Sequence, residues 1–181
     1  MGKRLGVEVP FMRPSELALD TSPTLSALQH AVSWLKENEE YYPDAVMLLQ
    51  PTAPLRQSRH IQEAVEMFKS SGADSVVSVV EIPGHFSPYW AVVDGENGRA
   101  KLFIGEPIRK RIPRRQEFPQ KTYAHNGAIY LFKTELLFHL EKPSLYGDHI
   151  RLYPMEEKYS VNIDSPGDWE LAEAAIKKIR N

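Results

Sequence analysis

The sequence predicts an α/β fold in which helices pack on the faces of a mostly parallel sheet. Short apolar runs at 45–49 and 75–80 have the length of buried strands, and Ser58 to Phe68 between them has apolar residues at helical spacing. Such a strand–helix–strand unit crosses over right-handedly and makes its two strands parallel. The proline-rich stretch 84–126 breaks this pattern and predicts an antiparallel excursion from the sheet.

The first helix is expected to begin at Asp20–Thr24, where hydroxyl side chains can cap free amides and Pro23 suits the first turn. Apolar residues at helical spacing carry it to about Lys36. The run Ala45–Leu49 that follows is continuously apolar, a pattern typical of a strand covered on both faces. The sequence Gln50-Pro51 ends this strand abruptly.

The second helix is expected to stop at Ser71-Gly72, because glycine ends helices readily. Inside the excursion, short alternating strands at 90–93 and 99–103 surround a turn-like segment. The chain then returns to the sheet. The remaining expected elements are a strand at 128–132, a helix at about 134–140, a strand near 150–153 and a helix at about 168–178.

The length of 181 residues suits one domain, and we expect residues 1–181 to form it. A net charge of -2 gives no attraction to nucleic acid or anionic membrane, and the absence of cysteine removes disulfides and thiolate chemistry. The six histidines are isolated, which disfavours a zinc site. No stretch is long and apolar enough to span a bilayer, so the sequence favours a cytoplasmic protein that binds neither membrane nor nucleic acid.

Motifs of the serine hydrolases, the P-loop enzymes and the dinucleotide-binding oxidoreductases do not occur. Polar residues instead follow the first strand, in the segment Leu48–Arg56. Gln50 can donate and accept hydrogen bonds at once, as the recognition of a nucleobase or of sugar hydroxyls requires. The alternative is that Pro51 and Pro54 merely stop a strand and that Arg56 is a solvated charge.

A second polar motif, Ser160–Pro166, precedes the last helix. Asn162 and Asp164 lie on the same side of an extended segment, so an amide oxygen and a carboxylate could share one cation. Magnesium prefers such a pair, completed by phosphate oxygens and waters. The competing interpretation is that Ser165 or Asp164 only caps the helix.

A third cluster joins the basic residues of 109–115 to Gln116 and Pro119. Guanidinium groups bind phosphate or carboxylate in pairs, so the cluster suits an anion. A run of charges is more often a solvated face or a subunit contact. The interleaved prolines favour a shaped anion site.

These motifs, in this order, resemble the acylneuraminate cytidylyltransferases, also called CMP-sialic acid synthetases. The resemblance implies a Rossmann-like sheet of the nucleotide-diphospho-sugar transferase type, with a homodimer formed by the excursion. It also implies that the anomeric hydroxyl of a nine-carbon 2-keto sugar acid attacks the α-phosphate of CTP, with Mg²⁺ as cofactor. The matching segments are Val9–Pro14 with Glu16–Ala18, Leu49–Arg56, Arg114–Gln116 with Pro119, Asn126–Tyr130 and Asn162–Asp164.

The resemblance also implies roles for single residues. Gln50, Arg115 and Asp164 are expected to act in catalysis around one crevice, and Asp164 with Asn162 to hold the metal. The residues expected at the nucleotide are Arg13, Ser22, Thr24, Gln50 and Thr52. Those expected at the acceptor sugar are Arg115, Asn126 and Tyr130, with Gln50 also near it.

Three departures from the family pattern matter. Asn162 stands where the family usually has aspartate, and Ala124 where it often has arginine. The family's first strand and its glycine- and lysine-rich phosphate loop have no counterpart, because the chain opens beyond them. We therefore expect little or no activity from this polypeptide alone. Two alternatives stay open: a nucleotide-sugar-dependent glycosyltransferase, in which 162–164 replaces an Asp-x-Asp metal motif, and a non-catalytic binding or dimerisation module.

Overall fold

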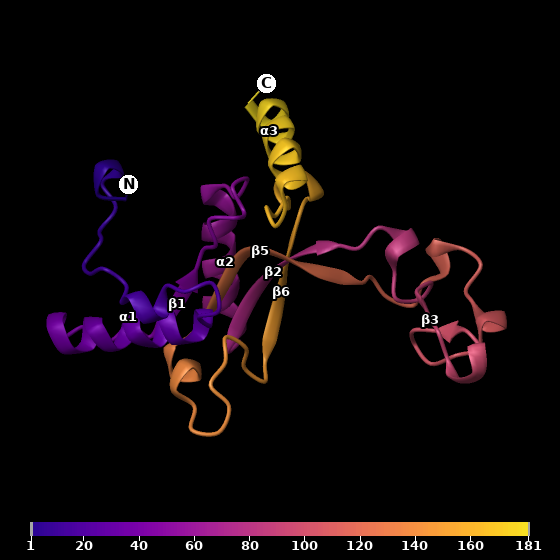
Figure 1. Ribbon diagram of the computed structural model, residues 1–181, viewed down its shortest axis with the longest axis horizontal. Coiled ribbons are helices and arrows are strands. Elements are labelled where there is room, and N and C mark those ends of the chain that lie inside the picture. The colour runs from indigo at the N-terminus through magenta and orange to yellow at the C-terminus, as the bar shows by residue number, and fades with distance from the viewer. Residues whose placement is uncertain (1, 181) are drawn as a thin grey trace.

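A computed structural model describes residues 2–180, and its central element is a four-stranded sheet with helices on both faces (Figure 1). The strands lie in the order β1-β5-β2-β6. Strand β5 is the longest and pairs on both of its edges, so it is the centre of the fold. The strands are β1 (Ala45–Leu48), β2 (Ser75–Glu81), β5 (Tyr123–Lys133) and β6 (Ile150–Met155).

The sheet is mixed, so the prediction of a mostly parallel sheet is wrong for neighbouring strands. Strands β1 and β2 run in the same direction, as a crossover unit requires, but β5 lies between them and is antiparallel to both. Among the described residues, β2 and β6 form the one parallel pair. A local pattern predicts the direction of the strands in one unit, but not which distant strand inserts between them.

Strand β1 is only half-buried, although its apolar run was expected to be covered on both faces. It lies at the edge of the sheet formed by residues 2–180, where β5 is its one partner. Helix α1 (Thr24–Glu39) packs on one face of this sheet, through a cluster built around Val32, Phe132 and Leu137. Its first residue follows Pro23 and no side chain caps it, so the expected hydroxyl cap is absent.

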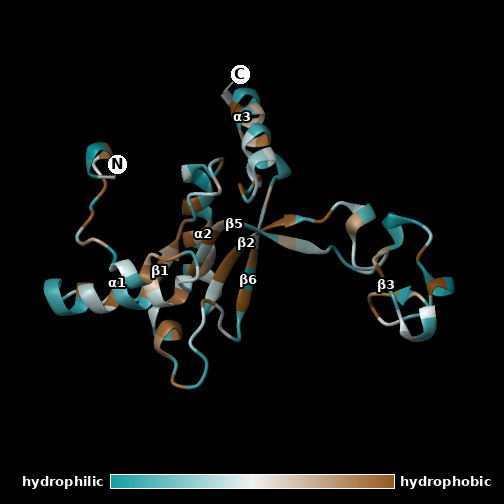
Figure 2. Cartoon of the chain, viewed as in Figure 1, coloured by the Kyte–Doolittle hydropathy of each residue, from teal (hydrophilic) through white to brown (hydrophobic). Residues whose placement is uncertain are grey.

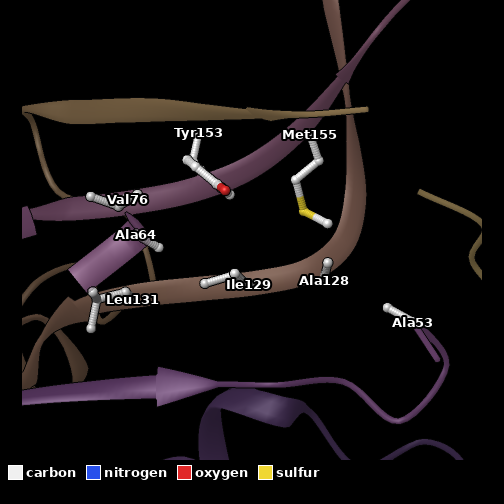
Figure 3. Packing of buried hydrophobic residues seen from close by; sticks show 8 residues of the cluster. All are labelled: Ala53, Ala64, Val76, Ala128, Ile129, Leu131, Tyr153 and Met155. Atoms are coloured by element: carbon white, nitrogen blue, oxygen red, sulfur yellow. The ribbon is translucent and has the colours of Figure 1, made fainter. Parts of the chain in front are cut away.

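Helix α2 (Ser58–Ser71) has the expected bounds and packs on the opposite face. Its N-terminus forms a capping box, in which the buried His60 Nδ1 accepts the backbone N–H of Gln57 at 3.1 Å. Gly72, in the left-handed conformation, ends the helix. Figure 3 shows Ala64 of this helix facing side chains of β2, β5 and β6, where the larger hydrophobic core lies.

The excursion forms and is set apart from the rest of the fold, at the end of the long β2 and β5 strands (Figure 1). It contains the antiparallel pair β3 (Val92–Val93) and β4 (Lys101–Leu102), which confirms the predicted strands. Leu102 is buried, and Phe118 packs edge-on against Trp90. Figure 2 shows that further apolar segments occur within it. The exposed large apolar side chains of the excursion are Phe86, Val92, Phe103, Ile104 and Ile108.

The C-terminal part differs from the prediction in detail. Residues Thr134–Phe138 form a short 3-10 helix within the helix expected at about 134–140. Helix α3 (Pro166–Arg180) stands out from the sheet (Figure 1) and buries Ala172, while Trp169 and Leu171 stay exposed. Of the helices in residues 2–180, none has the length and apolarity needed to cross a bilayer.

The capping box makes stability depend on pH. Burial, followed by the charge of Arg59, lowers the pKa of His60, and only the neutral ring can accept the Gln57 N–H. Because its pKa is lower in the folded state, this contribution is complete above the unfolded pKa of about 6.5 and is lost as the pH falls through it, at up to about 1.4 kcal/mol per pH unit.

Urea unfolding of the wild type and of His60→Gln between pH 8 and pH 5 measures this effect. Glutamine at this position keeps the capping acceptor but does not titrate. We expect the wild type to lose more stability than the variant as the pH falls. Equal pH dependence of the two proteins would contradict the assignment.

Candidate active site

The candidate site lies where β1 ends and the chain turns at Gln50. Arg56 stabilises this turn, because its Nη1 donates to the carbonyl of Ala128 on β5 at 2.6 Å and to that of Gln50 at 3.3 Å. Burial lowers the pKa of Arg56. The side chain is therefore a structural link between the turn and β5, not the solvated charge of the alternative interpretation.

Gly127 is the point at which two polar motifs meet. Its φ of +69° lies in the left-handed region, as an Asn-Gly sequence favours. A Cβ at this position would lie 2.8 Å from Gln50 Oε1 and 3.1 Å from Asn162 Oδ1. The missing side chain thus lets Gln50 and Asn162 approach the same point of β5.

The second motif, Ser160–Pro166, lies close to the first, Leu48–Arg56. The N–H of Ile163 donates to the carbonyl of Thr52 at 2.8 Å, so the segments around residues 52 and 163 lie side by side. Asn162 Nδ2 donates to Asp164 Oδ2 at 2.6 Å. The amide oxygen of Asn162 is buried, and the described residues offer it no hydrogen-bond partner.

Asp164 is not the cap of the last helix. Asp168 has that role: its Oδ2 accepts the backbone N–H groups of Asp164 at 3.1 Å and of Ser165 at 2.7 Å. These bonds, with one from the Ser165 hydroxyl, lower the pKa of Asp168. The Asp164 carboxylate stays exposed, in a hollow of about 530 Å³ that Trp169 also lines.

Asn126 is buried directly before Gly127, and its side chain is occupied by protein groups. Its Oδ1 accepts from the Ser78 hydroxyl at 2.6 Å, and its Nδ2 donates to the Ser160 hydroxyl at 3.0 Å. Asn126 thereby joins β5 to β2 and to the segment that leads to Asn162. In this structure Asn126 stabilises the positions of β2, β5 and the segment before Asn162 relative to one another.

Tyr130 belongs to an aromatic group on the α1 side of β5. Its ring centroid lies 6.3 Å from that of His125 and 6.5 Å from that of Tyr146. Burial raises the pKa of Tyr130, so its hydroxyl stays protonated and can donate. Tyr130 pairs with Leu48 across the strands, which places it near the end of β1.

The N-terminal residues of the predicted nucleotide site lie before or at the start of α1. Ser22 stabilises the local loop, because its hydroxyl donates to the carbonyl of Glu16 at 2.9 Å and accepts from the N–H of Leu19 at 3.1 Å. Arg13 and Thr24 are exposed. No recorded contact within residues 2–180 joins these three side chains to Gln50.

Arg115 lies on the excursion side of the molecule. Its aliphatic stem packs over Gly84, where a Cβ would meet its Cδ at 3.1 Å, and it lines a cavity of about 850 Å³. A neighbouring cavity of about 550 Å³ includes Asn162, and the two share the wall formed by Val80–Pro83. Within residues 2–180, no hydrogen bond or ion pair joins Arg115 to Gln50 or Asp164.

Sequence reasoning did not assign roles to Gly127, Asp168 and Trp169. The Asn-Gly sequence was a usable signal for Gly127, since it favours a positive φ. Asp168 stands three residues after Ser165, the spacing of a capping partner. The sequence offers no such signal for Trp169, because its position in the hollow beside Asp164 depends on the direction of α3 in the fold.

The residues present fit a weakly held magnesium ion. No cluster of three or more His, Asp or Glu side chains occurs in residues 2–180. Asp164 Oδ2 is occupied by Asn162, while no hydrogen bond is recorded to its Oδ1. One free carboxylate oxygen at an exposed position suits Mg²⁺, which takes one or two protein oxygens and otherwise phosphates and water.

Comparisons with known proteins define the class. A scan against models of protein families finds no match. The fold resembles that of a solved CMP:2-keto-3-deoxy-manno-octonic acid synthetase in complex with CTP, with a TM-score of 0.60 at 17% identity, over 98% of this chain and 75% of that one. The protein therefore has the nucleotidyltransferase fold of a CMP–sugar-acid synthetase.

Sequence comparison is more specific. The chain is 30% identical over 178 residues to post-translational flagellin modification protein B of Campylobacter coli, covering 97% of this chain and 71% of that protein. It is 31% identical over 174 residues to the CMP-N,N'-diacetyllegionaminic acid synthase of Legionella pneumophila, covering 95% and 70%. The chain belongs to the acylneuraminate cytidylyltransferase family of nucleotidyltransferases, which confirms the resemblance.

A third relative is longer. The chain is 32% identical over 164 residues to the N-acylneuraminate cytidylyltransferase of Streptococcus agalactiae serotype V. The match covers 91% of this chain but 36% of that protein. The chain thus spans about a third of this relative's length.

Replacing Gly127 tests the junction of the two motifs. In Gly127→Ala the methyl group must displace Gln50 and Asn162, and the left-handed backbone adds strain of about 1–2 kcal/mol. Gly72→Ala is the matched control, because Gly72 has a φ of +64° but nothing within 4 Å of an added Cβ. We expect Gly127→Ala to lose about 1 kcal/mol more than the control in urea unfolding; equal losses would contradict a close approach at Gly127.

Proposed function

We propose that this protein transfers CMP from CTP to the anomeric hydroxyl of a sialic-acid-like, nine-carbon 2-keto sugar acid and releases pyrophosphate. The observation that carries the proposal is the meeting of Gln50, Asn162 and Asp164 at the end of β1. Ligands of open α/β sheets bind at the carboxyl ends of such strands. The names of the relatives, which include an N-acylneuraminate cytidylyltransferase and a CMP-N,N'-diacetyllegionaminic acid synthase, support CTP and a sugar acid as substrates.

The reaction needs no covalent enzyme intermediate. The anomeric oxygen forms a bond to the α-phosphorus, the bond from that phosphorus to the pyrophosphate oxygen breaks, and the hydroxyl proton leaves to solvent. Positioning and charge neutralisation supply most of the acceleration in such a transfer. Gln50 suits the positioning role, because its amide can donate to one substrate and accept from the other.

The proposed metal is magnesium, with Asp164 as its main protein ligand and Asn162 as the second candidate. When bound, the ion neutralises phosphate charge. Asp164 fits because its Oδ1 is open and its carboxylate is not used to cap α3. Asn162 would need to turn its amide over, since its N–H now faces Asp164.

The other predicted residues enter the proposal as contacts around this centre. Tyr130 is proposed to contact the acceptor sugar, and Asn126 to act at that site by holding Ser160 and Ser78 in place. Thr52 lies beside Ile163 and is proposed to face the nucleotide. The remaining residues proposed for the nucleotide, on the resemblance alone, are Arg13, Ser22 and Thr24.

A homodimer formed by the excursion is part of the proposal. The excursion is set apart from the sheet (Figure 1) and exposes several large apolar side chains, which supports a role as a contact surface. Arg115 lies on that side, where it lines a cavity, and within residues 2–180 no hydrogen bond joins it to Gln50. We propose that it completes the site of a neighbouring subunit, where its guanidinium would bind the carboxylate of the sugar acid.

Nucleotide binding is the first readout of the proposed function, and CMP-sugar formation from CTP the second. Asp164→Asn should weaken magnesium-dependent CTP binding by about 10-fold or more, because it removes the charge at the open oxygen. Glu170→Gln is the matched control: Glu170 lines the same hollow, but its loss should leave binding unchanged. Calorimetry with CTP and with CMP, with and without Mg²⁺, measures nucleotide binding by the two variants.

Two outcomes would overturn the proposal. A folded chain that binds neither CTP nor CMP with magnesium present would favour a non-catalytic binding or dimerisation module. Consumption of a nucleotide-sugar without CMP-sugar formation from CTP would identify a glycosyltransferase.

A further inference from the structure

The side chain of Asn162 is bonded at one end and enclosed at the other. Its Nδ2 donates to Asp164 Oδ2 at 2.6 Å, and its Oδ1 is buried near Gly127, which Gln50 Oε1 also approaches. The backbone that follows is also held, since the N–H of Ile163 donates to the carbonyl of Thr52. Asn162 therefore has little freedom, in contrast to the exposed Asp164 beside it.

The bond between the two side chains is charge-assisted, because a carboxylate accepts it. It is also the one recorded hydrogen bond to the Asp164 side chain among the described residues. Asp168, the nearest other carboxylate along the chain, is occupied with the start of α3. The orientation of the Asp164 carboxylate thus depends on Asn162.

An amide at this position also sets the charge of the pair. Two carboxylates 2.6 Å apart would repel each other unless a cation or a shared proton lay between them. Asparagine instead donates a hydrogen bond, so the pair carries a single negative charge and is stable without a cation. The buried Oδ1 would be more costly as a carboxylate oxygen, because no recorded group in residues 2–180 donates to it.

We propose that Asn162 is a positioning residue and not a second ligand of the ion: its hydrogen bond orients the Asp164 carboxylate and is formed before any cation binds. Asp164 Oδ1 is then the one protein oxygen of the pair that meets the ion, and most of the ion's attraction comes from the phosphates that accompany it. This inference deepens the proposed function and rests on it where it concerns nucleotide, but the assignment of the Asn162–Asp164 bond can be tested without any nucleotide.

Exchange of the two residues is the sharpest test. Asn162→Asp places two carboxylates together, so its melting temperature in EDTA should fall below that of the wild type and recover as MgCl₂ is added. The double variant Asn162→Asp with Asp164→Asn keeps one amide and one carboxylate. It should regain the part of the loss in EDTA that comes from repulsion between the two carboxylates, but not the cost of the carboxylate oxygen buried at position 162. It should also show no magnesium dependence beyond that of the wild type.

The positioning role has a separate readout. Asn162→Ala leaves Asp164 intact but unheld, so we expect the magnesium concentration that half-saturates CTP binding to rise about 10-fold, as is usual when a supporting partner of a metal ligand is removed. Asn162→Ser, which keeps a short donor, should recover part of that change. A merely structural role for Asn162 would lower the melting temperature without moving this concentration.

The outcomes separate the inference about the Asn162–Asp164 bond from the proposed function. If Asn162→Asp melts in EDTA at the temperature of the wild type, or if the double variant recovers nothing, the proposed bond does not set the site and the inference is wrong. If Asn162→Ala leaves the magnesium requirement of CTP binding unchanged, Asn162 does not position Asp164 for the ion. If the exchange behaves as expected but neither CTP nor CMP binds, the bond stands and the proposed function fails.

Discussion

The backbone conformation of Gly127 is the constraint on which the candidate site depends. A left-handed residue in the middle of β5 interrupts the regular pairing with β2, where the register shifts between Val77 and Val79. The absence of a Cβ then leaves space that Gln50 and Asn162 enter from two other segments of the chain. A side chain at this position would have to displace both, so the close approach of Gln50 and Asn162 depends on one irregularity in the central strand.

The order of the strands explains why this irregularity acts on both motifs at once. Strand β5 lies between β1 and β2, so its residues face the end of β1 on one side and the Ser78 region on the other. Arg56 fixes the turn after β1 to the carbonyl of Ala128, directly beside Gly127. Asn126, on the other side of Gly127, holds Ser160 in place. Three consecutive residues of β5 thus organise two loops that are far apart in sequence.

Local features of the sequence predicted local structure well. The bounds of α2 followed from Gly72 and the apolar spacing, although Gln57 and not Ser58 is the N-cap, and the end of β1 followed from where the apolar run stops. The insertion of β5 could not be predicted, because periodicity reports how one segment is buried and strand order depends on pairing between distant segments. The same limit applies to Arg56: a guanidinium that binds the carbonyl of the distant Ala128 has the same local sequence as one in solvent.

The separation of Arg115 from Gln50 follows from the same architecture. Strands β2 and β5 extend past the end of β1, and the excursion follows at their far ends (Figure 1). The residues of the excursion therefore lie away from the end of β1 in their own chain. Arg56 is engaged by two backbone carbonyls, and in the proposed dimer a second copy whose excursion packs over the first would bring the guanidinium of Arg115. Charge is consistent with that proposal, because the pair Asn162–Asp164 supplies a single negative charge and no cation, whereas the two proposed substrates are both anionic. An active centre built around Gln50 and Asp164 therefore needs positive charge from outside the pair, and magnesium together with Arg115 of a neighbouring subunit would supply it.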